Sequence, residues 1–250
     1  MTGCILTYHH VAKAPPHHPK PHLFVPPQEF KIQMEFLHEK GFRVVTLDEI
    51  RNGLLEGKKP LPRSVAITFD DGFEDNFHYA FPILRQQGFS ATIFMVAKNI
   101  RKNEGTNHEN NTGDRYLTWE QLQQMNQGGL TIGAHSTTHK RLSVIGEDQA
   151  KKEIDTSKKI LEQGLQQSVH WFCYPFGSFN KKVADYVRMA GFLGAASTIR
   201  DNRIKPFQLY YMPRIMVMPG ISRLHFRYYF SVLYHLVHNR KNKKRWKGYI

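Results

Sequence analysis

Short runs of apolar residues alternate along this chain with longer stretches in which apolar positions recur every three or four residues. The short runs have the length of strands and lie at residues 4–8, 42–45, 64–69, 91–96, 130–134, 169–174 and 192–196. The longer stretches follow a helical period, as at Phe30, Met34 and Leu37. Strands that alternate with helices are typical of a parallel sheet, and seven strands predict a barrel-like α/β arrangement.

Local signals mark the ends of some of these elements. Thr46 and Thr118 each precede acids or amides in the pattern of a helix N-cap. Two connections are unusually long, a proline-rich one at residues 14–27 and a polar one at residues 98–116. Loops that follow strand C-termini build the sites of parallel α/β proteins, so both are candidates for the rim of a pocket. The alternative is that both are surface loops without chemistry.

The composition fits one globular domain. The chain has 250 residues, of which 40% are hydrophobic, and this is enough for a substantial core. The longest apolar runs, such as residues 228–237, are far shorter than the ~20 residues that cross a bilayer, and the first residues do not resemble a secretory signal. Cys4 and Cys173 are too few for a disulfide framework, which fits a reducing compartment. We therefore expect a cytoplasmic protein.

The net charge of +14 is concentrated near the C-terminus. Residues 202–250 contain eleven Lys or Arg and no Asp or Glu. Aromatic and aliphatic residues beside such a basic run are typical of contact with an anionic membrane surface, so a peripheral position on the cytoplasmic membrane face is possible. No specific nucleic acid is expected, because no nucleic-acid motif is present. The alternative is a C-terminal helix packed on the domain with a solvated tail.

Two adjacent carboxylates follow a run with the pattern of a buried strand. Residues 64–69 end directly in Asp70, Asp71 and Gly72. Neighbouring carboxylates near a cleft repel each other unless a cation or a proton separates their roles, so this strand end is a candidate site. The structural alternative is a turn that caps a helix beginning near Asp75.

A pair of histidines follows another strand. His135 and His139 come directly after residues 130–134. In a helical turn, side chains four residues apart share one face, so we expect both imidazoles to converge on one ion. One Asp and two His make a sound ligand set for Zn²⁺ or a similar divalent ion, and they leave positions open for water and substrate.

Three segments at the ends of successive strands resemble the polysaccharide deacetylases, carbohydrate esterase family four. They are TFDDG at residues 68–72, HSTTH at 135–139 and YPFG at 174–177. The resemblance covers about residues 4–217. It implies a distorted (β/α) barrel of about seven parallel strands, and a metal-dependent removal of acetyl groups from sugars.

The resemblance assigns roles to the first two segments. Carried over by motif, Asp71, His135 and His139 would bind one divalent metal ion, zinc by preference with cobalt or nickel as alternatives. Asp70 would act as the general base. Residues 1–220 would then form the catalytic barrel, and residues 221–250 an aromatic and basic C-terminal helix and tail.

The third segment and the first strand would supply the remaining roles. Tyr174, Pro175 and Phe176 would contact the substrate, and the backbone N–H of Phe176 would stabilise the oxyanion. The general acid is open between two residues. A branch that resembles the poly-N-acetylglucosamine deacetylases has a first strand that ends in Tyr-His, which favours His9 over His235 near the C-terminus.

The chain departs from the family pattern at two places. Many members have an arginine two residues before the proline of the third segment, where Cys173 stands here. We expect Arg214 to take over as the partner of Asp70. The acidic-tryptophan motif of the family is also missing, because residues 197–201 read STIRD.

These features lead to one main functional hypothesis. We expect a metal-dependent hydrolase that removes N-acetyl groups from an N-acetylated glycan or a lipid-linked saccharide. Two alternatives remain open: a catalytically inactive module that binds sugar or docks on a membrane, and a hydrolase of another small amide on the same fold.

Overall fold

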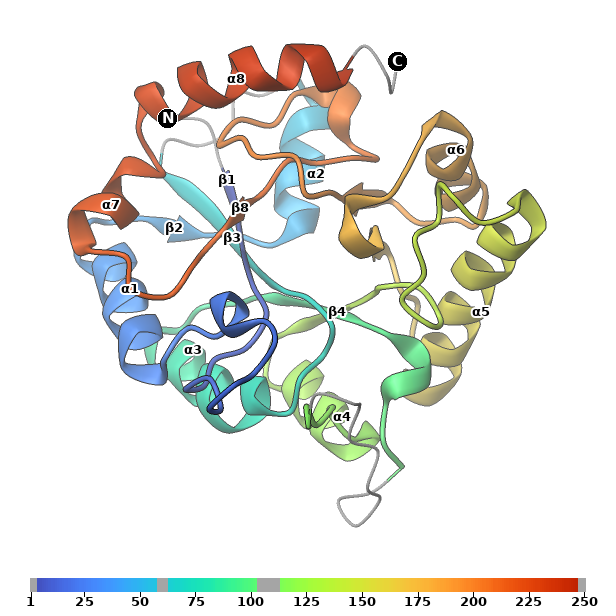
Figure 1. Cartoon of the computed structure of the whole chain (residues 1–250), viewed down its shortest axis with the longest axis horizontal. Coiled ribbons are helices and arrows are strands. Elements are labelled where there is room, and N and C mark those ends of the chain that lie inside the picture. The colour runs from blue at the N-terminus through green and yellow to red at the C-terminus, as the bar shows by residue number, and fades with distance from the viewer. Residues whose placement is uncertain (1–3, 58–62, 103–112, 247–250) are drawn as a thin grey trace.

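A curled parallel sheet forms the centre of the molecule (Figure 1). The computed structural model describes residues 4–57, 63–102 and 113–246. The strands are β1 (Cys4–Tyr8), β2 (Arg43–Val44), β3 (Ser64–Phe69), β4 (Thr92–Met95), β5 (Thr131–Ala134), β6 (Trp171–Cys173), β7 (Gly194–Ala196) and β8 (Ile215–Met216). Their order is β7-β6-β5-β4-β3-β1-β8, and β2 pairs with the first half of β3.

This sheet confirms the predicted α/β fold with a distorted barrel of parallel strands. Each of the seven strand-like runs in the sequence contains one strand, whereas β8 was not predicted. The sheet does not close fully. Among the described residues β7 and β8 do not pair, and an isolated bridge joins Ala196 of β7 to Met212, in the segment before β8.

The helices cover the outside of the sheet (Figure 1). They are α1 (Pro27–Glu39), α2 (Leu47–Leu55), α3 (Phe81–Gln87), α4 (Trp119–Gln127), α5 (Glu147–Leu165), α6 (Lys181–Met189), α7 (Arg223–Tyr228) and α8 (Val232–Trp246), with short helical turns η1 (Pro21–Leu23), η2 (Asn76–Ala80), η3 (Ala97–Asn99), η4 (Pro175–Gly177) and η5 (Pro206–Gln208). The predicted caps are present, since Thr46 and Thr118 each form a capping box at the start of α2 and α4.

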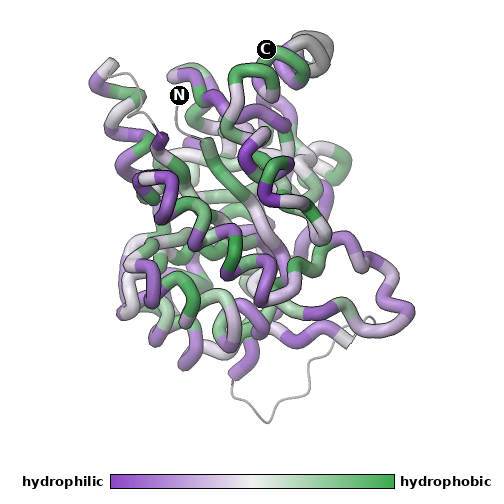
Figure 2. The backbone as a smooth tube through the Cα atoms, turned by 90° about the vertical axis from the view of Figure 1, so that its left-hand side faces the viewer, coloured by the Kyte–Doolittle hydropathy of each residue, from purple (hydrophilic) through white to green (hydrophobic). Residues whose placement is uncertain are grey.

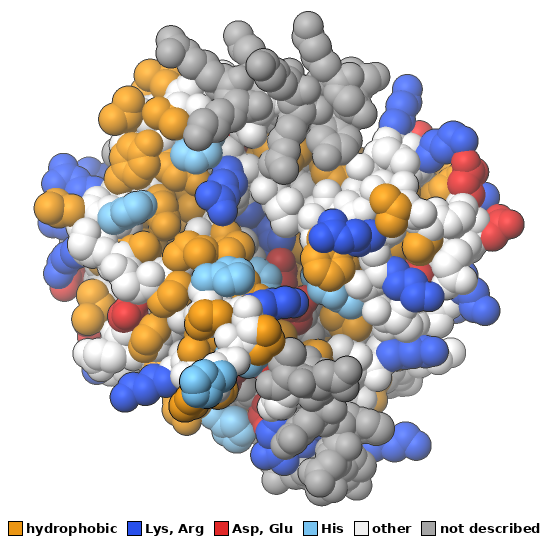
Figure 3. All heavy atoms as spheres, viewed as in Figure 1, with side chains coloured by type: hydrophobic (Ala, Val, Ile, Leu, Met, Phe, Trp, Pro, Cys, Tyr) orange, Lys and Arg blue, Asp and Glu red, His pale blue; other side chains and the backbone are white. Residues whose placement is uncertain are grey.

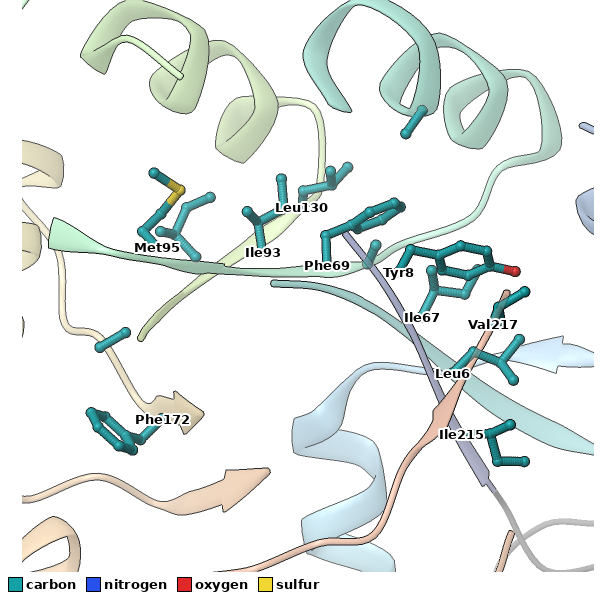
Figure 4. Packing of buried hydrophobic residues seen from close by; sticks show 14 of the residues in the cluster. Leu6, Tyr8, Ile67, Phe69, Ile93, Met95, Leu130, Phe172, Ile215 and Val217 are labelled. Carbon is teal, nitrogen blue, oxygen red and sulfur yellow. The ribbon is translucent and has the colours of Figure 1, made fainter. Parts of the chain in front are cut away.

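The alternation of side chains along each strand divides the core in two. Leu6 and Tyr8 of β1, with Ile67 and Phe69 of β3, pack in the layer between the sheet and the helices (Figure 4). Figure 2 shows that hydrophobic colour runs along the strand that crosses the interior. The intervening residues face into the barrel, where a second cluster includes Ile5, Ala66, Phe94, Trp171 and Met212.

Polar residues replace this apolar filling towards the carboxyl ends of the strands. Thr7 on β1 and Thr68 on β3 are buried at the same parity as Ile5 and Ala66. Both hydroxyls accept a hydrogen bond from Arg214, at 3.0 and 3.1 Å. The barrel interior therefore changes from apolar to polar at the edge where the predicted site lies.

The C-terminal segment packs on the barrel. Phe226 of α7 is buried against Phe36 of α1, with ring centroids 5.6 Å apart. Phe230 lies against Phe42 at 4.4 Å, and the Asn202 side chain donates to the backbone carbonyl of Tyr229 at 2.8 Å. Most of the basic run from residue 240 onward lies outside the residues whose side chains the structure describes. Among the described residues, no helix is both long and apolar enough to cross a membrane.

This packing predicts that the C-terminal segment contributes to the stability of the barrel. Phe226→Ala should lower the free energy of unfolding by about 3–5 kcal/mol, because it leaves a cavity between α7 and α1. Leu224→Ala, on the same helix at a side chain that is 77% exposed, should change it by less than about 0.5 kcal/mol. Urea denaturation of both variants measures the difference. Equal effects would show that α7 does not fold as part of the barrel.

Candidate metal centre

A cavity of about 600 Å³ opens at the carboxyl ends of the strands. It is lined by residues that follow or end β1, β3, β5, β6, β7 and β8, and by the loop at residues 20–23. Figure 3 looks onto this face, where red carboxylates lie in a recess surrounded by histidines and by Lys and Arg side chains. Of the two long loops, the proline-rich one therefore contributes to the rim as predicted. Residues 103–112 of the other lie outside the described residues.

Three predicted ligands meet in this cavity. Asp71 Oδ1 lies 3.4 Å from His135 Nε2 and 3.1 Å from His139 Nε2. The three atoms that these residues can offer to a metal lie within 4.8 Å of one another. Asp71 Oδ1 is buried and accepts no hydrogen bond from the described part of the chain. A carboxylate oxygen and two imidazole nitrogens that face one point, with one oxygen otherwise unsatisfied, fit a divalent cation.

The backbone of a tight loop, and not the helical turn expected from the spacing, brings His135 and His139 together. Residues 135–139 form no helical turn, so that part of the prediction is wrong. Ser136 and His139 instead have left-handed backbones, with φ of 61° and 60°. The Ser136 hydroxyl accepts from the His139 N–H at 2.9 Å. A tight loop with two strained residues thus brings the imidazoles together.

A buried glutamate holds this loop, and the sequence analysis did not identify it. Glu153 of α5 is 3% exposed. Its carboxylate accepts from the N–H groups of Thr137 and Thr138 at 3.0 and 2.8 Å, and from the Thr138 hydroxyl at 2.5 Å. Glu153 lies in an ordinary amphipathic helix, so no local pattern distinguishes it from a solvent-exposed acid.

The orientation and charge of the ligands suit a metal ion. His135 Nδ1 donates to the Cys173 carbonyl at 2.7 Å, and this directs Nε2 into the cavity. Burial by itself raises the pKa of Asp71, but the attraction of the nearby His135 and His139 imidazoles outweighs burial and lowers this pKa well below its usual value. Asp71 is therefore a carboxylate at neutral pH.

The second carboxylate, Asp70, is held by Arg214. Two parallel hydrogen bonds of 2.7 Å join the guanidinium to both carboxylate oxygens, and both residues are buried. Burial raises the pKa of Asp70, but the Arg214 charge and its hydrogen bond more than offset this and lower the pKa below its usual value. The contact expected from the departure at Cys173 is thus present, and it keeps Asp70 ionised beside the ligand set.

A second group of possible ligands shares His135 with the first. Asp70, His135 and Cys173 also place donor atoms within 4.8 Å of one another. However, the Arg214 guanidinium lies 3.0 Å from Cys173 Sγ and binds both oxygens of Asp70. A fixed cation at this position repels a metal ion, and burial raises the pKa of the Cys173 thiol, which keeps it protonated. The donor set around Asp71 is therefore the better metal site.

The other predicted site residues occupy different positions around the cavity. His9, Tyr174 and Phe176 line it, whereas Pro175 is buried and is not part of its wall. The Tyr174 hydroxyl donates to the backbone carbonyl of Tyr210 at 2.8 Å, so this side chain also supports the neighbouring loop. Phe176 has a left-handed backbone, with φ of 58°, and is 45% exposed beside His139.

The two candidates for the general acid are far from equivalent. His9 lines the cavity with both carboxylates. His235 is buried on α8, where its Nδ1 pairs with Asp201 at 2.7 Å, and it is not part of the cavity wall. Burial lowers the pKa of His9, although Asp71 and Asp70 oppose this effect. A proton on His9 is therefore held weakly.

Comparison with known proteins gives relatives in sequence. A family model described as polysaccharide deacetylase matches residues 57–195. The Bacillus subtilis protein YxkH, which carries a polysaccharide deacetylase name, is 32% identical over 218 residues, which are 87% of this chain and 72% of that protein. A poly-beta-1,6-N-acetyl-D-glucosamine N-deacetylase of Staphylococcus epidermidis is 28% identical over 202 residues, and the match covers 76% of this chain and 66% of that protein.

Solved structures share the fold. The deacetylase PplD from Streptococcus pyogenes, in complex with acetate, matches with a TM-score of 0.82 at 23% identity and covers 92% of this chain and 99% of that chain. IcaB from Ammonifex degensii matches with a TM-score of 0.74 at 24% identity, over 90% and 94% of the two chains. The partly closed barrel is thus a fold shared with these proteins.

The geometry predicts which donor set binds a metal ion. Asp71→Asn should lose most of the bound metal, because it removes the ligand charge at nearly constant volume. Cys173→Ser should keep about one ion per chain, because its side chain belongs only to the group that Arg214 blocks. Elemental analysis of the purified variants, after equilibration with Zn²⁺ and removal of free metal, measures both. Loss of metal in Cys173→Ser alone would assign the ion to the other donor set.

Proposed function

Since the chain belongs to the polysaccharide deacetylase family, we propose that it hydrolyses N-acetyl groups on an N-acetylated sugar or polysaccharide. One observation carries this proposal: an ionised carboxylate, Asp70, lies directly beside a three-residue metal site in an open cavity. A base next to a metal site is the arrangement that hydrolysis by activated water requires.

The metal site supplies electrophilic chemistry, and Asp70 supplies the base. When bound, a divalent cation acidifies a water molecule and polarises the acetyl carbonyl. Asp71, His135 and His139 would hold this cation, and zinc suits the donor set, with cobalt or nickel as alternatives. Asp70 takes the proton of the attacking water. Arg214 fixes both oxygens of Asp70, which limits the directions from which the carboxylate can accept that proton.

The other side of the cavity supplies the oxyanion donor and the acid. The Phe176 N–H donates to the oxygen that becomes negative during attack. His9 delivers a proton to the leaving sugar nitrogen, which departs poorly as an anion. The products are acetate and a free amino sugar.

The substrate class rests on the relatives and on the shape of the cavity. The staphylococcal relative is named for its action on poly-beta-1,6-N-acetyl-D-glucosamine. A cavity of about 600 Å³ that is open to solvent admits a glycan segment rather than only a small amide. A lipid-linked saccharide presents the same N-acetyl group and is included in the proposal.

The proposed roles predict which variants lose activity. Asp70→Asn should lower kcat about 10²–10⁴-fold, because it removes the general base, while bound metal stays near the wild-type level. His170→Ala, at an exposed histidine outside the cavity, should leave kcat unchanged. Acetate release from N-acetylglucosamine oligomers, with metal content determined on the same samples, gives both values. Near-normal turnover by Asp70→Asn would exclude it as the base.

The role of His9 predicts a dependence on the leaving group. His9→Ala should lower the rate of amide hydrolysis about 10²–10⁴-fold. It should have little effect on hydrolysis of 4-nitrophenyl acetate, because a phenolate leaves without a proton. Asp70→Asn should lower both rates. If His9→Ala lowered both rates equally, the residue would act in water activation or binding and not as the acid.

We also propose that the C-terminal helices place the protein on an anionic membrane. Val232, Leu233, Leu236 and Val237 of α8 are between 39% and 59% exposed, and their spacing puts them on one face of the helix. The chain from residue 202 onward contains no acid and eleven Lys or Arg. An exposed apolar face within a basic segment matches a bilayer with negative headgroups.

This proposal predicts that an acid on the exposed face weakens membrane binding. Leu233→Asp and Leu236→Asp should reduce co-sedimentation with vesicles that contain phosphatidylglycerol, since each places a charge where the apolar face meets lipid. Leu55→Asp, on α2 at a side chain of similar exposure, 61%, should not. Wild-type binding should fall in high salt and be absent with phosphatidylcholine alone. Equal binding by all variants would exclude α8 as the contact.

A further inference from the structure

Two cations on the rim of the cavity have no acidic partner within the described part of the chain. Lys20 and Arg200 both line the cavity and are exposed. Neither makes an ion pair with any residue in the ranges 4–57, 63–102 and 113–246. The acids of the cavity wall are Asp70 and Asp71. Arg214 neutralises Asp70, and Asp71 belongs to the metal site. Neither acid therefore balances the positive charges of Lys20 and Arg200.

The loop that carries Lys20 is anchored by a cluster of buried rings. The Lys20 N–H donates to His18 Nδ1 at 3.2 Å, and His18 Nε2 lies 3.2 Å from Asp114. His10 is stacked between two phenylalanine rings, Phe24 and Phe73, at 3.8 and 3.6 Å. These contacts hold the proline-rich loop against the barrel. The backbone at Lys20 is therefore fixed beside the cavity, and only its side chain is free to move.

The backbone at Arg200 is fixed as well. Its carbonyl accepts from the Asn242 side chain at 2.9 Å. The residue before it, Ile199, accepts from the Arg214 N–H at 2.8 Å, and the residue after it, Asp201, pairs with His235. Both cations thus project from anchored segments on the cavity wall, an arrangement that lowers the entropy lost when a ligand binds.

We propose that Lys20 and Arg200 form a subsite for an anionic group on the substrate, so that the substrate is an acidic N-acetylated glycan. The anionic group is a carboxylate, as in a uronic acid, or a phosphate ester. Unpaired cations at the mouth of a concave site attract anions and raise their local concentration. Both groups accept hydrogen bonds from ammonium and guanidinium ions. This inference rests on the proposed function and adds to it the charge of the substrate.

Binding without turnover tests the subsite directly. The probes are β-1,4-linked tetrasaccharides of glucuronate and of glucose, which contain no acetyl group, titrated into the metal-loaded protein by calorimetry. The glucuronate probe should bind more tightly, and Lys20→Gln and Arg200→Gln should each weaken its binding about two- to fivefold, the range for exposed ion pairs. Neither variant should change binding of the glucose probe. Lys20→Arg should restore wild-type binding.

Control variants separate the subsite from general electrostatics. Lys159→Gln removes the same charge from an exposed position on α5, away from the cavity, and should leave binding of both probes unchanged. If the glucuronate probe bound equally well to Lys20→Gln, Arg200→Gln and wild type, its carboxylates would be held by the metal alone. That result would overturn the proposal, as would equal affinity of wild type for the two probes.

Turnover then identifies the anionic group and separates failure of the subsite from failure of the proposed function. Acetate release is compared for neutral N-acetylglucosamine oligomers, for oligomers that alternate N-acetylglucosamine with glucuronate, and for oligomers phosphorylated at O6. A higher kcat/KM for one acidic series, lost through KM in the Lys20 and Arg200 variants, identifies the group. Turnover of neutral oligomers without any acidic preference would overturn the subsite and keep the proposed function. No acetate from any series would overturn the proposed function, while the binding data would still decide the subsite.

Discussion

The burial of one guanidinium determines how the site end of this barrel is built. Arg214 is 1% exposed inside the barrel, where an unpaired charge is strongly unfavourable. Its nitrogens are therefore satisfied from several strands at once. They donate to Thr7 near the end of β1 and to Thr68 and Asp70 at the end of β3. They also donate to the sulfur of Cys173 on β6 and to the carbonyl of Ser197 after β7. Each of these partners must reach the barrel axis at the same level, and this requirement fixes the strand ends relative to one another.

The metal site follows from the same constraint. The Asp70 side chain points inward to Arg214. In an extended strand the side chain of the next residue, Asp71, would point to the opposite face of the sheet. Asp71 instead has a left-handed backbone, with φ of 70°, and turns its carboxylate to the two imidazoles. Gly72 also has positive φ, and a Cβ there would lie 2.3 Å from the Met95 side chain. The sharp turn thus requires a glycine and separates two adjacent carboxylates into a base and a ligand.

The features predicted correctly from the sequence, the strands and the edge of the sheet that carries the site, are those that a local pattern of residues determines. Strand runs that end at Tyr174 or just before Asp70 and His135 located the edge of the sheet where the cavity lies, because parallel strands end on one side. The sequence did not predict how His135 and His139 converge, since backbone strain at Ser136 has no signature in a spacing of four residues. Glu153 was missed for a related reason: its hydrogen bonds cross from α5 to a loop far away in sequence, and only the packed structure brings them together.

The position of Arg214 links the base to the weakest seam of the sheet. Among the described residues β7 and β8 do not pair, and β7 makes only an isolated bridge to Met212, before β8, so side chains and loop backbone must hold this part of the barrel closed. Arg214 does so from the β8 side, because its N–H donates to Ile199 and its Nε to Ser197, both after β7. With Arg214, the same side chain closes the barrel and orients Asp70, so the geometry of the base depends on closure of the fold.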